Sequence, residues 1–393
     1  MRRNSYIFTL AFVGMIAAFG PFVTDFYLPA LPALSEYFAA PASMIQLSLT
    51  VSMIGLGAGQ LVVGPLSDRY GRRLPLLLSL AAFIAATAGC IATDSIGRFL
   101  AYRFVQGLAG AGGLVISRSI ATDLYSGREL ARFFSVLGSV QGIVPVAAPV
   151  IGGLLLAVTD WKGIFTVLLG IGVVLLAMTL VFRESLTQRS LSITASFKGY
   201  APVLRNRRSM RYMGLQAMAM GVMFSYISAS PFIFQQQYGL SPVAYSLCFG
   251  LNAFGIMAGS LMVLRSRSSE RGLALGARGF FVMALVTALV LTQGGSVWIV
   301  EASLFVLLVM LGTILPTSTT LALEPLREHS GSASAALGFL SFLVGGICSP
   351  LVGMGDMTLS TSAVITVCAL ATLLLARGAD HTPATLQADG HLS

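Results

Sequence analysis

Charged side chains are scarce in this sequence. Asp, Glu, Lys and Arg make up 10% of its 393 residues, whereas a soluble globular domain carries about 25%. Hydrophobic residues make up 56%, and the mean hydropathy is +0.85. So few charges cannot cover the surface of a soluble protein of this size. The net charge of +9 is spread over short loops instead of one basic face, which argues against a nucleic-acid partner. The composition therefore indicates a protein embedded in a lipid bilayer.

Reactive and metal-binding patterns are also missing. The four cysteines all lie in apolar runs without pairing or metal-ligand spacing, and we interpret them as small hydrophobic residues. The sequence contains no HExxH, CxxC, GxSxG or P-loop motif. We therefore expect no metal, no cofactor and no enzymatic activity. An ATP-driven pump would need a separate subunit to hydrolyse the ATP.

Long apolar runs, by contrast, are abundant. A helix needs about 20 mostly apolar residues to cross a bilayer, and these runs are too long and too uniformly apolar for the strands of an outer-membrane barrel. The sequence predicts twelve spans, at 6–34, 44–66, 74–93, 95–117, 130–157, 162–182, 212–236, 243–264, 274–293, 297–323, 332–354 and 359–377.

A polar stretch divides these spans into six and six. We expect an N-terminal bundle over 1–182, a cytoplasmic linker over 183–211, a C-terminal bundle over 212–377 and a disordered tail over 378–393. A faint repeat supports duplication, because Tyr37 and Pro41 match Tyr238 and Pro242 at a constant offset. The predicted fold class is an all-α integral membrane protein of twelve transmembrane helices in two pseudo-symmetric six-helix bundles.

Lysine and arginine are distributed unevenly across the predicted membrane. An even number of spans leaves both ends of the chain on one side, and the loops and ends of that side hold 21 of the 24 basic residues. The other side holds Arg98 and Lys162, while Arg103 lies within a span. Basic loops stay on the cytoplasmic side of a membrane. We therefore expect both termini to be cytoplasmic.

Ionisable residues inside the spans are functional candidates, because each costs roughly 2.5–3.5 kcal/mol on insertion scales. Asp25 lies late in 6–34 and Arg103 early in 95–117, so the two fall at comparable depths and are expected to pair. Gln106 lies one turn from Arg103 on the same helix face. A carboxyl whose hydration and arginine contact change also changes its proton affinity. These residues are therefore predicted to couple transport to protons, with a static clamp between helices as the alternative.

Glu301 is another acid in an apolar run, 297–323. It lies close to the end of that run and is interpreted as an interfacial residue. Asp25 is then the one acid that the sequence places well inside the membrane.

Helix breakers gather in the span 130–157. Proline removes a backbone hydrogen bond and kinks a helix, and glycine lets a neighbouring helix approach closely. A generic kinked span would explain this pattern, but the density of breakers equally favours a hinge or sealing surface. The breakers are Gly138, Gly142, Pro145, Pro149, Gly152 and Gly153.

The loop 64–75 reads GPLSDRYGRRLP, in which two glycines allow a tight turn and one acid can pair with several arginines. A merely basic cytoplasmic loop would explain the arginines but not the acid or the spacing. The string resembles the G-x-x-x-D-R-x-G-R-R signature of the major facilitator superfamily. The matching positions are Gly64, Asp68, Arg69, Gly71, Arg72 and Arg73.

Further strings narrow this resemblance to the drug:proton antiporters, and within them to the Bcr/CflA multidrug efflux group of bacterial inner-membrane exporters. They are TDFYLPALP (24–32), RFVQG (103–107), APVIGG (148–153) and GSASAALG (331–338). The resemblance covers essentially the whole chain and implies the major facilitator fold, with a central cavity between the two bundles.

The resemblance also implies roles for particular residues. Asp25 would carry the proton, with Arg103 and Gln106 as its polar partners. The loop 64–75 would hold one face shut, with Asp68 near the start of the span 332–354. The antiporter motif would comprise Pro145, Pro149, Gly152 and Gly153.

Two positions depart from the family pattern. Ala148 stands where that motif often has glycine, and Ala17 stands where some multidrug relatives carry a second acid. A single membrane acid makes divalent cations poor candidates for the substrate.

The leading hypothesis is a proton-coupled exporter of small amphipathic drugs, such as bicyclomycin, amphenicols or sulfonamides, that works by alternating access. A same-fold exporter of a metabolite, such as cysteine, another amino acid or a sugar, is the alternative and predicts a polar cavity. A membrane enzyme or receptor is a third class, which the gating loop argues against. The expected partners are the substrate, protons and the bilayer, and the expected state is a monomer. Candidate cavity aromatics are Phe22, Tyr27, Phe104, Tyr226, Phe232 and Phe254.

Overall fold

The computed structural model describes residues 5–125, 127–186, 200–263 and 269–377, and every regular element among them is a helix. The N-terminal half contains α1 (Tyr6–Asp25), η1 (Leu28–Ala30), α2 (Leu31–Tyr37), α3 (Ala42–Tyr70), α4 (Arg73–Ala92), α5 (Ile96–Leu124), α6 (Gly127–Leu156) and α7 (Trp161–Val181). The C-terminal half contains α9 (Tyr200–Arg205), α10 (Arg207–Phe232), η2 (Ile233–Gln237), α11 (Pro242–Met262), α12 (Ser269–Thr292), α13 (Val297–Leu323), η4 (Glu324–His329), α14 (Ser330–Leu351) and α15 (Met357–Arg377).

The long helices confirm the predicted membrane fold. Among the described residues, ten helices are long and apolar enough to cross a bilayer, or eleven if the bent segment from α1 to α2 forms one further span. The long helix α6 accounts for the remaining predicted span, and its apolar part is Ile143–Leu156. The result is roughly consistent with twelve predicted spans.

Some element boundaries differ from the sequence-based prediction. The predicted span 6–34 breaks after Asp25 into η1 and α2, both of which begin with a proline in the first turn, where its missing N–H is tolerated. Helix α10 begins at Arg207, inside the predicted linker. The predicted disordered tail lies outside the described residues.

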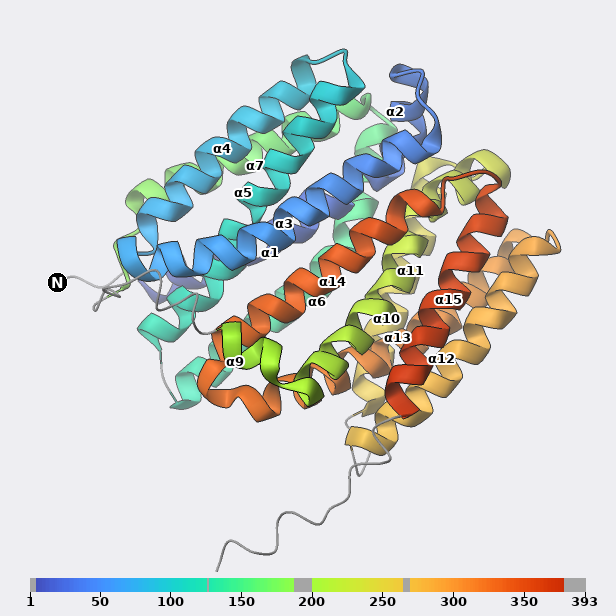
Figure 1. The fold of residues 1–393 in the computed structure, drawn as a ribbon. Helices are drawn as coiled ribbons and strands as arrows, with labels where there is room; N and C mark the ends of the chain where they lie inside the picture. The colour runs from blue at the N-terminus through green and yellow to red at the C-terminus, as the bar shows by residue number, and fades with distance from the viewer. Residues whose placement is uncertain (1–4, 126, 187–199, 264–268, 378–393) are drawn as a thin grey trace, which may run out of the picture.

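The two halves form two bundles that lie side by side (Figure 1). Helices α3 and α14 run along each other at the boundary, and α6 packs against α11. Successive long helices alternate in direction, so their connections fall on two faces. We call the face with the turn at 69–73 the basic face, and the face with the loops at 38–41 and 238–241 the opposite face.

Within each half, glycines bring the same two helices into close contact. In the N-terminal half, a Cβ at Gly107 of α5 would overlap the backbone carbonyl of Ser52 on α3. In the C-terminal half, a Cβ at Gly312 of α13 would overlap the carbonyl of Ile256 on α11. The second and fourth long helices of each half therefore meet backbone to backbone, as small residues allow in membrane proteins.

Candidate functional site

A cavity of about 480 Å³ lies between the two bundles. Its N-terminal wall comes mainly from α1, α3 and α5, and its C-terminal wall from α10, α11 and α14. Most of its lining is apolar, with Met220, Met223 and Met257 beside Phe224 and Phe342. Flexible methionine and planar aromatic side chains fit ligands of varied shape.

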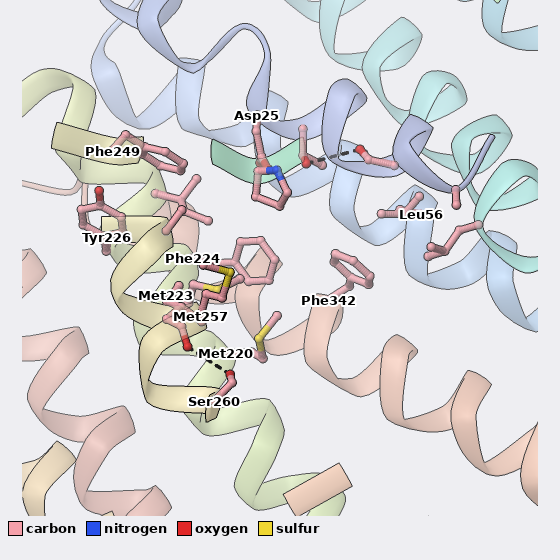
Figure 2. Close-up of a pocket in the computed structure, with 18 of the residues that line it drawn as sticks. Asp25, Leu56, Met220, Met223, Phe224, Tyr226, Phe249, Met257, Ser260 and Phe342 are labelled. Atoms are coloured by element: carbon pink, nitrogen blue, oxygen red, sulfur yellow. Dashed lines mark hydrogen bonds between the residues drawn. The ribbon is translucent and has the colours of Figure 1, made fainter. Parts of the chain in front are cut away.

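Polar groups mark the two ends of this cavity. Figure 2 shows Asp25 at one end and Ser260 at the other, with Phe224 and the methionines between them. Asp25 ends α1 near the opposite face, whereas Ser260 and the exposed Arg118 lie toward the basic-face ends of α11 and α5. The cavity therefore extends from a buried carboxyl toward the basic face.

Contacts between the halves close the cavity near the opposite face. Gln46 Nε2 of α3 donates to the Ser228 carbonyl of α10 at 3.1 Å, and Ser349 Oγ of α14 donates to the Gln46 carbonyl at 3.3 Å. Gln235 Nε2 also donates to the Pro29 carbonyl at 3.1 Å. These bonds join residues far apart in sequence, all at the opposite-face ends of their helices. The structure is thus sealed at this end.

Asp25 and Arg103 are both buried, at 7% and 0% exposure, but they do not form the predicted pair. Arg103 donates from Nη1 to Gln106 Oε1 at 2.6 Å and from Nη2 to the Val23 carbonyl at 2.9 Å. Its guanidinium lies 4.1 Å from the centre of the Tyr27 ring. Because successive residues turn by about 100° around a helix, Asp25 lies on a different side of α1 from Val23, and Tyr27 lies beyond the end of that helix. Similar depth could be read from the sequence, but helix face could not.

Gln106 extends the Arg103 network inside the N-terminal bundle. Its Nε2 donates to Thr87 Oγ1 of α4 at 2.7 Å. Gln106 is fully buried and is absent from the cavity lining, as is Arg103. This network therefore holds α1, α4 and α5 together behind the wall that carries Asp25.

A polar chain in the C-terminal half was not predicted. Asn252 Nδ2 of α11 donates to the Tyr226 hydroxyl of α10 at 3.0 Å and to Glu301 Oε2 of α13 at 3.1 Å. Glu301 is 5% exposed, so its side chain is buried in the bundle, although it lies near the helix end where the sequence placed it. Its position near the start of an apolar run suggested an interface. The amide on the neighbouring helix, which could have signalled burial, is not adjacent in sequence.

The loop between α3 and α4 is held by ion pairs within its own half. Arg72 binds Asp123 of α5 through two hydrogen bonds, at 2.8 and 3.1 Å, and also pairs with Asp68. Ser185 Oγ donates to Asp123 at 2.9 Å. Asp68 makes no bond to α14 among the described residues, so its predicted contact with the start of that helix is not present in this structure. Asp123 is a participant that sequence reasoning missed.

The rest of this loop joins α4 to the end of α7. Glu184 accepts the backbone N–H groups of Arg72 and Arg73 at 2.9 and 3.2 Å, which caps the start of α4. Arg73 in turn donates to the carbonyls of Thr179 and Leu180 in the last turn of α7. A cation at a helix C-terminus is favourable. Arg69 is exposed and lies over the Tyr70 ring.

Only one of the two predicted turn glycines lies in the turn. Gly71 has a φ of 93°, in the left-handed region that glycine adopts without strain. Gly64 lies inside α3, which continues to Tyr70, and so does not form the turn as expected. The helix continues because Pro65 follows Gly64 without breaking it, a tolerance common in membrane helices.

The predicted motif of α6 lies at the junction of the halves. Pro145 lines the cavity and Pro149 is buried. A Cβ at Gly152 would overlap the Phe26 carbonyl just beyond α1, and one at Gly153 would overlap Ser246 of α11. These glycines therefore let α6 touch both the first helix and the other half.

The six predicted cavity aromatics are scattered through the bundles, and one of them, Tyr226, lines the cavity. Phe104 and Phe254 are exposed on the outer surface, at 38% and 53%. Uniformly apolar helices do not reveal which side faces inward, so the sequence missed Phe224, Phe249 and Phe342. The others pack among neighbouring helices: Phe22, Tyr27 and Phe232.

A comparison with protein families shows to which family this chain belongs. The model of the Major Facilitator Superfamily matches residues 9–350. The chain belongs to this superfamily. It is 38% identical over 359 residues to an uncharacterized MFS-type transporter, YdgK, of Bacillus subtilis (strain 168), covering 89% of each chain. It is 27% identical over 380 residues to a bicyclomycin resistance protein homolog of Haemophilus influenzae (strain ATCC 51907 / DSM 11121 / KW20 / Rd), covering 92% of each.

Solved structures agree with the family at the level of fold. The xylose transporter XylE from E. coli, in a partially occluded inward open conformation, superposes with a TM-score of 0.74 at 13% identity, covering 97% of this chain and 98% of that one. The match to the superfamily model and the similarity to the bicyclomycin resistance protein homolog confirm the resemblance to major facilitator drug:proton antiporters. This superfamily member is a multi-pass membrane protein with the family and fold of transporters of small molecules, which are not enzymes.

Proposed function

We propose that this superfamily member is a proton-coupled exporter of small amphipathic drugs, acting by alternating access in a bacterial inner membrane. The observation that carries the proposal is Asp25, a carboxyl at the sealed end of an otherwise largely apolar cavity between the two halves. The similarity to a bicyclomycin resistance protein homolog supports an antibiotic as substrate. The basic face is the cytoplasmic face, and both termini lie there.

The cavity lining favours a drug over a metabolite. Five of its nineteen residues carry polar side chains: Thr24, Asp25, Arg118, Tyr226 and Ser260. A sugar or amino-acid site would need more hydrogen-bonding groups, because each buried polar group of the ligand requires a partner. An amphipathic compound needs apolar contact and a few orienting groups. Amphenicols, bicyclomycin and sulfonamides meet this description.

Asp25 carries the proton in this mechanism. In the structure its end of the cavity is sealed toward the opposite face, and the substrate enters from the basic face. Substrate binding favours release of the proton to the cytoplasm, and the halves then rock to expose the cavity outside. Reprotonation from outside favours the return. Each charge that crosses 100 mV contributes about 2.3 kcal/mol to the cycle.

The remaining predicted residues position this machinery. Arg103 binds the Val23 carbonyl two residues before Asp25 and so holds that segment of α1 against α5. Gln106 fixes Arg103 in turn. Arg72 and Asp68 close the loop between α3 and α4, and the α6 glycines form the surface on which the halves rock.

Inverted vesicles with an imposed pH gradient test this function. Bicyclomycin, an amphenicol, a sulfonamide, a lipophilic cation and cysteine are added in turn, and the collapse of the gradient is recorded. At least one drug is expected to dissipate the gradient in the wild type, and Asp25→Asn is expected to abolish the effect. Glu36→Gln, which changes an exposed carboxyl of α2, is the matched control and should behave as wild type. Equal drug movement in wild type and Asp25→Asn would show a facilitator without proton coupling.

A further inference from the structure

Glu301 occupies a buried site that the proposed cycle does not use. It lies four residues after the start of α13, about 6 Å from the opposite-face end of that helix. Its Oε2 atom accepts one hydrogen bond, from Asn252, while its Oε1 atom is buried without a partner. None of the ion pairs among the described residues includes it. A structural carboxylate in a bundle normally has a cation or several donors.

The groups around Glu301 contain no positive charge among the residues that the structure describes. Its titratable neighbours are Tyr226 on α10 and Tyr245 and Cys248 on α11. The titratable residues of α12 lie in its first ten residues, at the basic-face end. On α14, Cys348 contacts the Cys368 thiol instead.

Asn252 can serve Glu301 in either protonation state. The Asn252 Nδ2 group donates to Glu301 Oε2, which suits an ionised carboxylate. The Asn252 Oδ1 atom is buried without a partner, as is Glu301 Oε1. A proton on Oε1 would make Glu301 a donor, and Asn252 Oδ1 on the same amide is an acceptor that lacks one. An acid and an amide paired in this way leave no buried polar atom unsatisfied.

The same amide connects Glu301 to the cavity. Asn252 also donates to the Tyr226 hydroxyl, and Tyr226 lines the cavity beside Phe249. The two rings are stacked with their centres 5.6 Å apart, and Figure 2 shows them together on one wall. A substrate against Tyr226 therefore changes the hydrogen bonding of Asn252 and, through it, the proton affinity of Glu301. Such coupling is reciprocal.

We propose that Glu301 is a second proton-binding residue of the transport cycle, linked to the substrate cavity through Asn252 and Tyr226. Asp25 and Glu301 then form one proton site in each half, both near the sealed end. Tyr245 is an electrostatic neighbour of both acids. The proton binds at Oε1 of Glu301 and leaves to water on the other side of the membrane. Two protons thus cross for each substrate exported.

Infrared difference spectroscopy of the purified full chain tests proton binding without any substrate. The carbonyl stretch of a protonated carboxyl is recorded during a pH titration. We expect Glu301→Gln to remove one titrating band and Asp25→Asn to remove another. The matched control Glu324→Gln, which changes an exposed acid at the other end of α13, should remove none of the buried bands. If Glu301→Gln leaves every titrating band in place, the proposal is wrong.

Asn252→Leu and Tyr226→Phe provide a second spectroscopic test. Asn252→Leu removes both the donor and the acceptor of the pair and should shift the Glu301 band, whereas Tyr226→Phe should leave its position nearly unchanged in the absence of drug. On adding chloramphenicol, the band should shift in the wild type but not in Tyr226→Phe. A Glu301 band that is indifferent to Asn252→Leu would overturn the link.

The stoichiometry rests on the proposed function and is measured in vesicles with the membrane potential clamped at zero. For an uncharged probe such as chloramphenicol, each coupled proton multiplies the limiting concentration ratio about tenfold per pH unit. We expect the limiting chloramphenicol ratio to change about hundredfold per pH unit in the wild type and about tenfold in Glu301→Gln. Equal limiting ratios in the two proteins would show that Glu301 does not carry a second coupled proton. If neither accumulates chloramphenicol, the proposed function fails for this drug, and the infrared titration alone decides the role of Glu301.

Discussion

The fourth long helix of each half buries one ionisable residue near the opposite face. The two residues differ in their hydrogen-bond partners. Arg103 of α5 has hydrogen bonds from both terminal nitrogens and an aromatic ring over its guanidinium. Glu301 of α13 has one hydrogen bond, an unpartnered oxygen and a polar link to the cavity. Corresponding helices of the two bundles thus use their buried charges differently: Arg103 ties helices together, while Glu301 can change protonation.

The largest expected effect separates these roles by stability. Arg103→Met should remove two charge-assisted hydrogen bonds, each worth roughly 1.5–3 kcal/mol. The Val23 carbonyl would lose its side-chain donor, and Gln106 Oε1 would keep only the Cys90 thiol. We expect a loss of about 3 kcal/mol or more, seen as a large drop in the thermal unfolding temperature of the detergent-purified protein. Glu301→Gln keeps an acceptor for Asn252 and should cost under about 1 kcal/mol. Similar losses of stability in the two variants would contradict the view that Arg103 is structural and Glu301 is not.

This comparison also shows what the sequence could predict. Helix count, the two halves and the family followed from long apolar runs and from the loop 64–75, because both signals are local. Asp25 was identified by its cost in a membrane, and it does line the cavity. The partners of Arg103 and Glu301 come from other helices, and a uniformly apolar helix has no pattern that reveals its inner face. For that reason the predicted Asp25–Arg103 pair was wrong and the burial of Glu301 against neighbouring helices was missed.

Missed residues near the basic face illustrate the same limit. Asp123 binds Arg72 from 51 positions further along the chain, and Glu184 caps α4 from the end of α7. Each is an acid on a basic side, which is a weak signal. Only the fold brings them to the loop that the motif identified.

A smaller effect tests whether the halves still pack alike where their charges differ. Gly107→Ala and Gly312→Ala would each place a methyl group against a backbone carbonyl, which cannot move aside easily. Overpacking of this kind costs about 1–3 kcal/mol, and we expect similar losses of thermal stability in both variants. Gly214→Ala is the control, because its nearest side-chain neighbour is Leu375 Cδ1 at 3.8 Å. Alanine should stabilise that helix slightly.

The smallest effect is expected at the basic face, where each half has an ion pair. Arg208 and Glu270 of the C-terminal half are about half exposed and 3.1 Å apart, so Glu270→Gln should change stability by about 0–1 kcal/mol, and salt should screen even that. Asp123, in the N-terminal half, is 13% exposed and binds Arg72 through two bonds. Asp123→Asn should therefore cost clearly more, with less dependence on salt. Thermal unfolding of both variants at low and high ionic strength measures the difference. Equal losses in Glu270→Gln and Asp123→Asn would show that the two ion pairs stabilise their halves equally. The Arg72–Asp123 pair would then not be the stronger of the two.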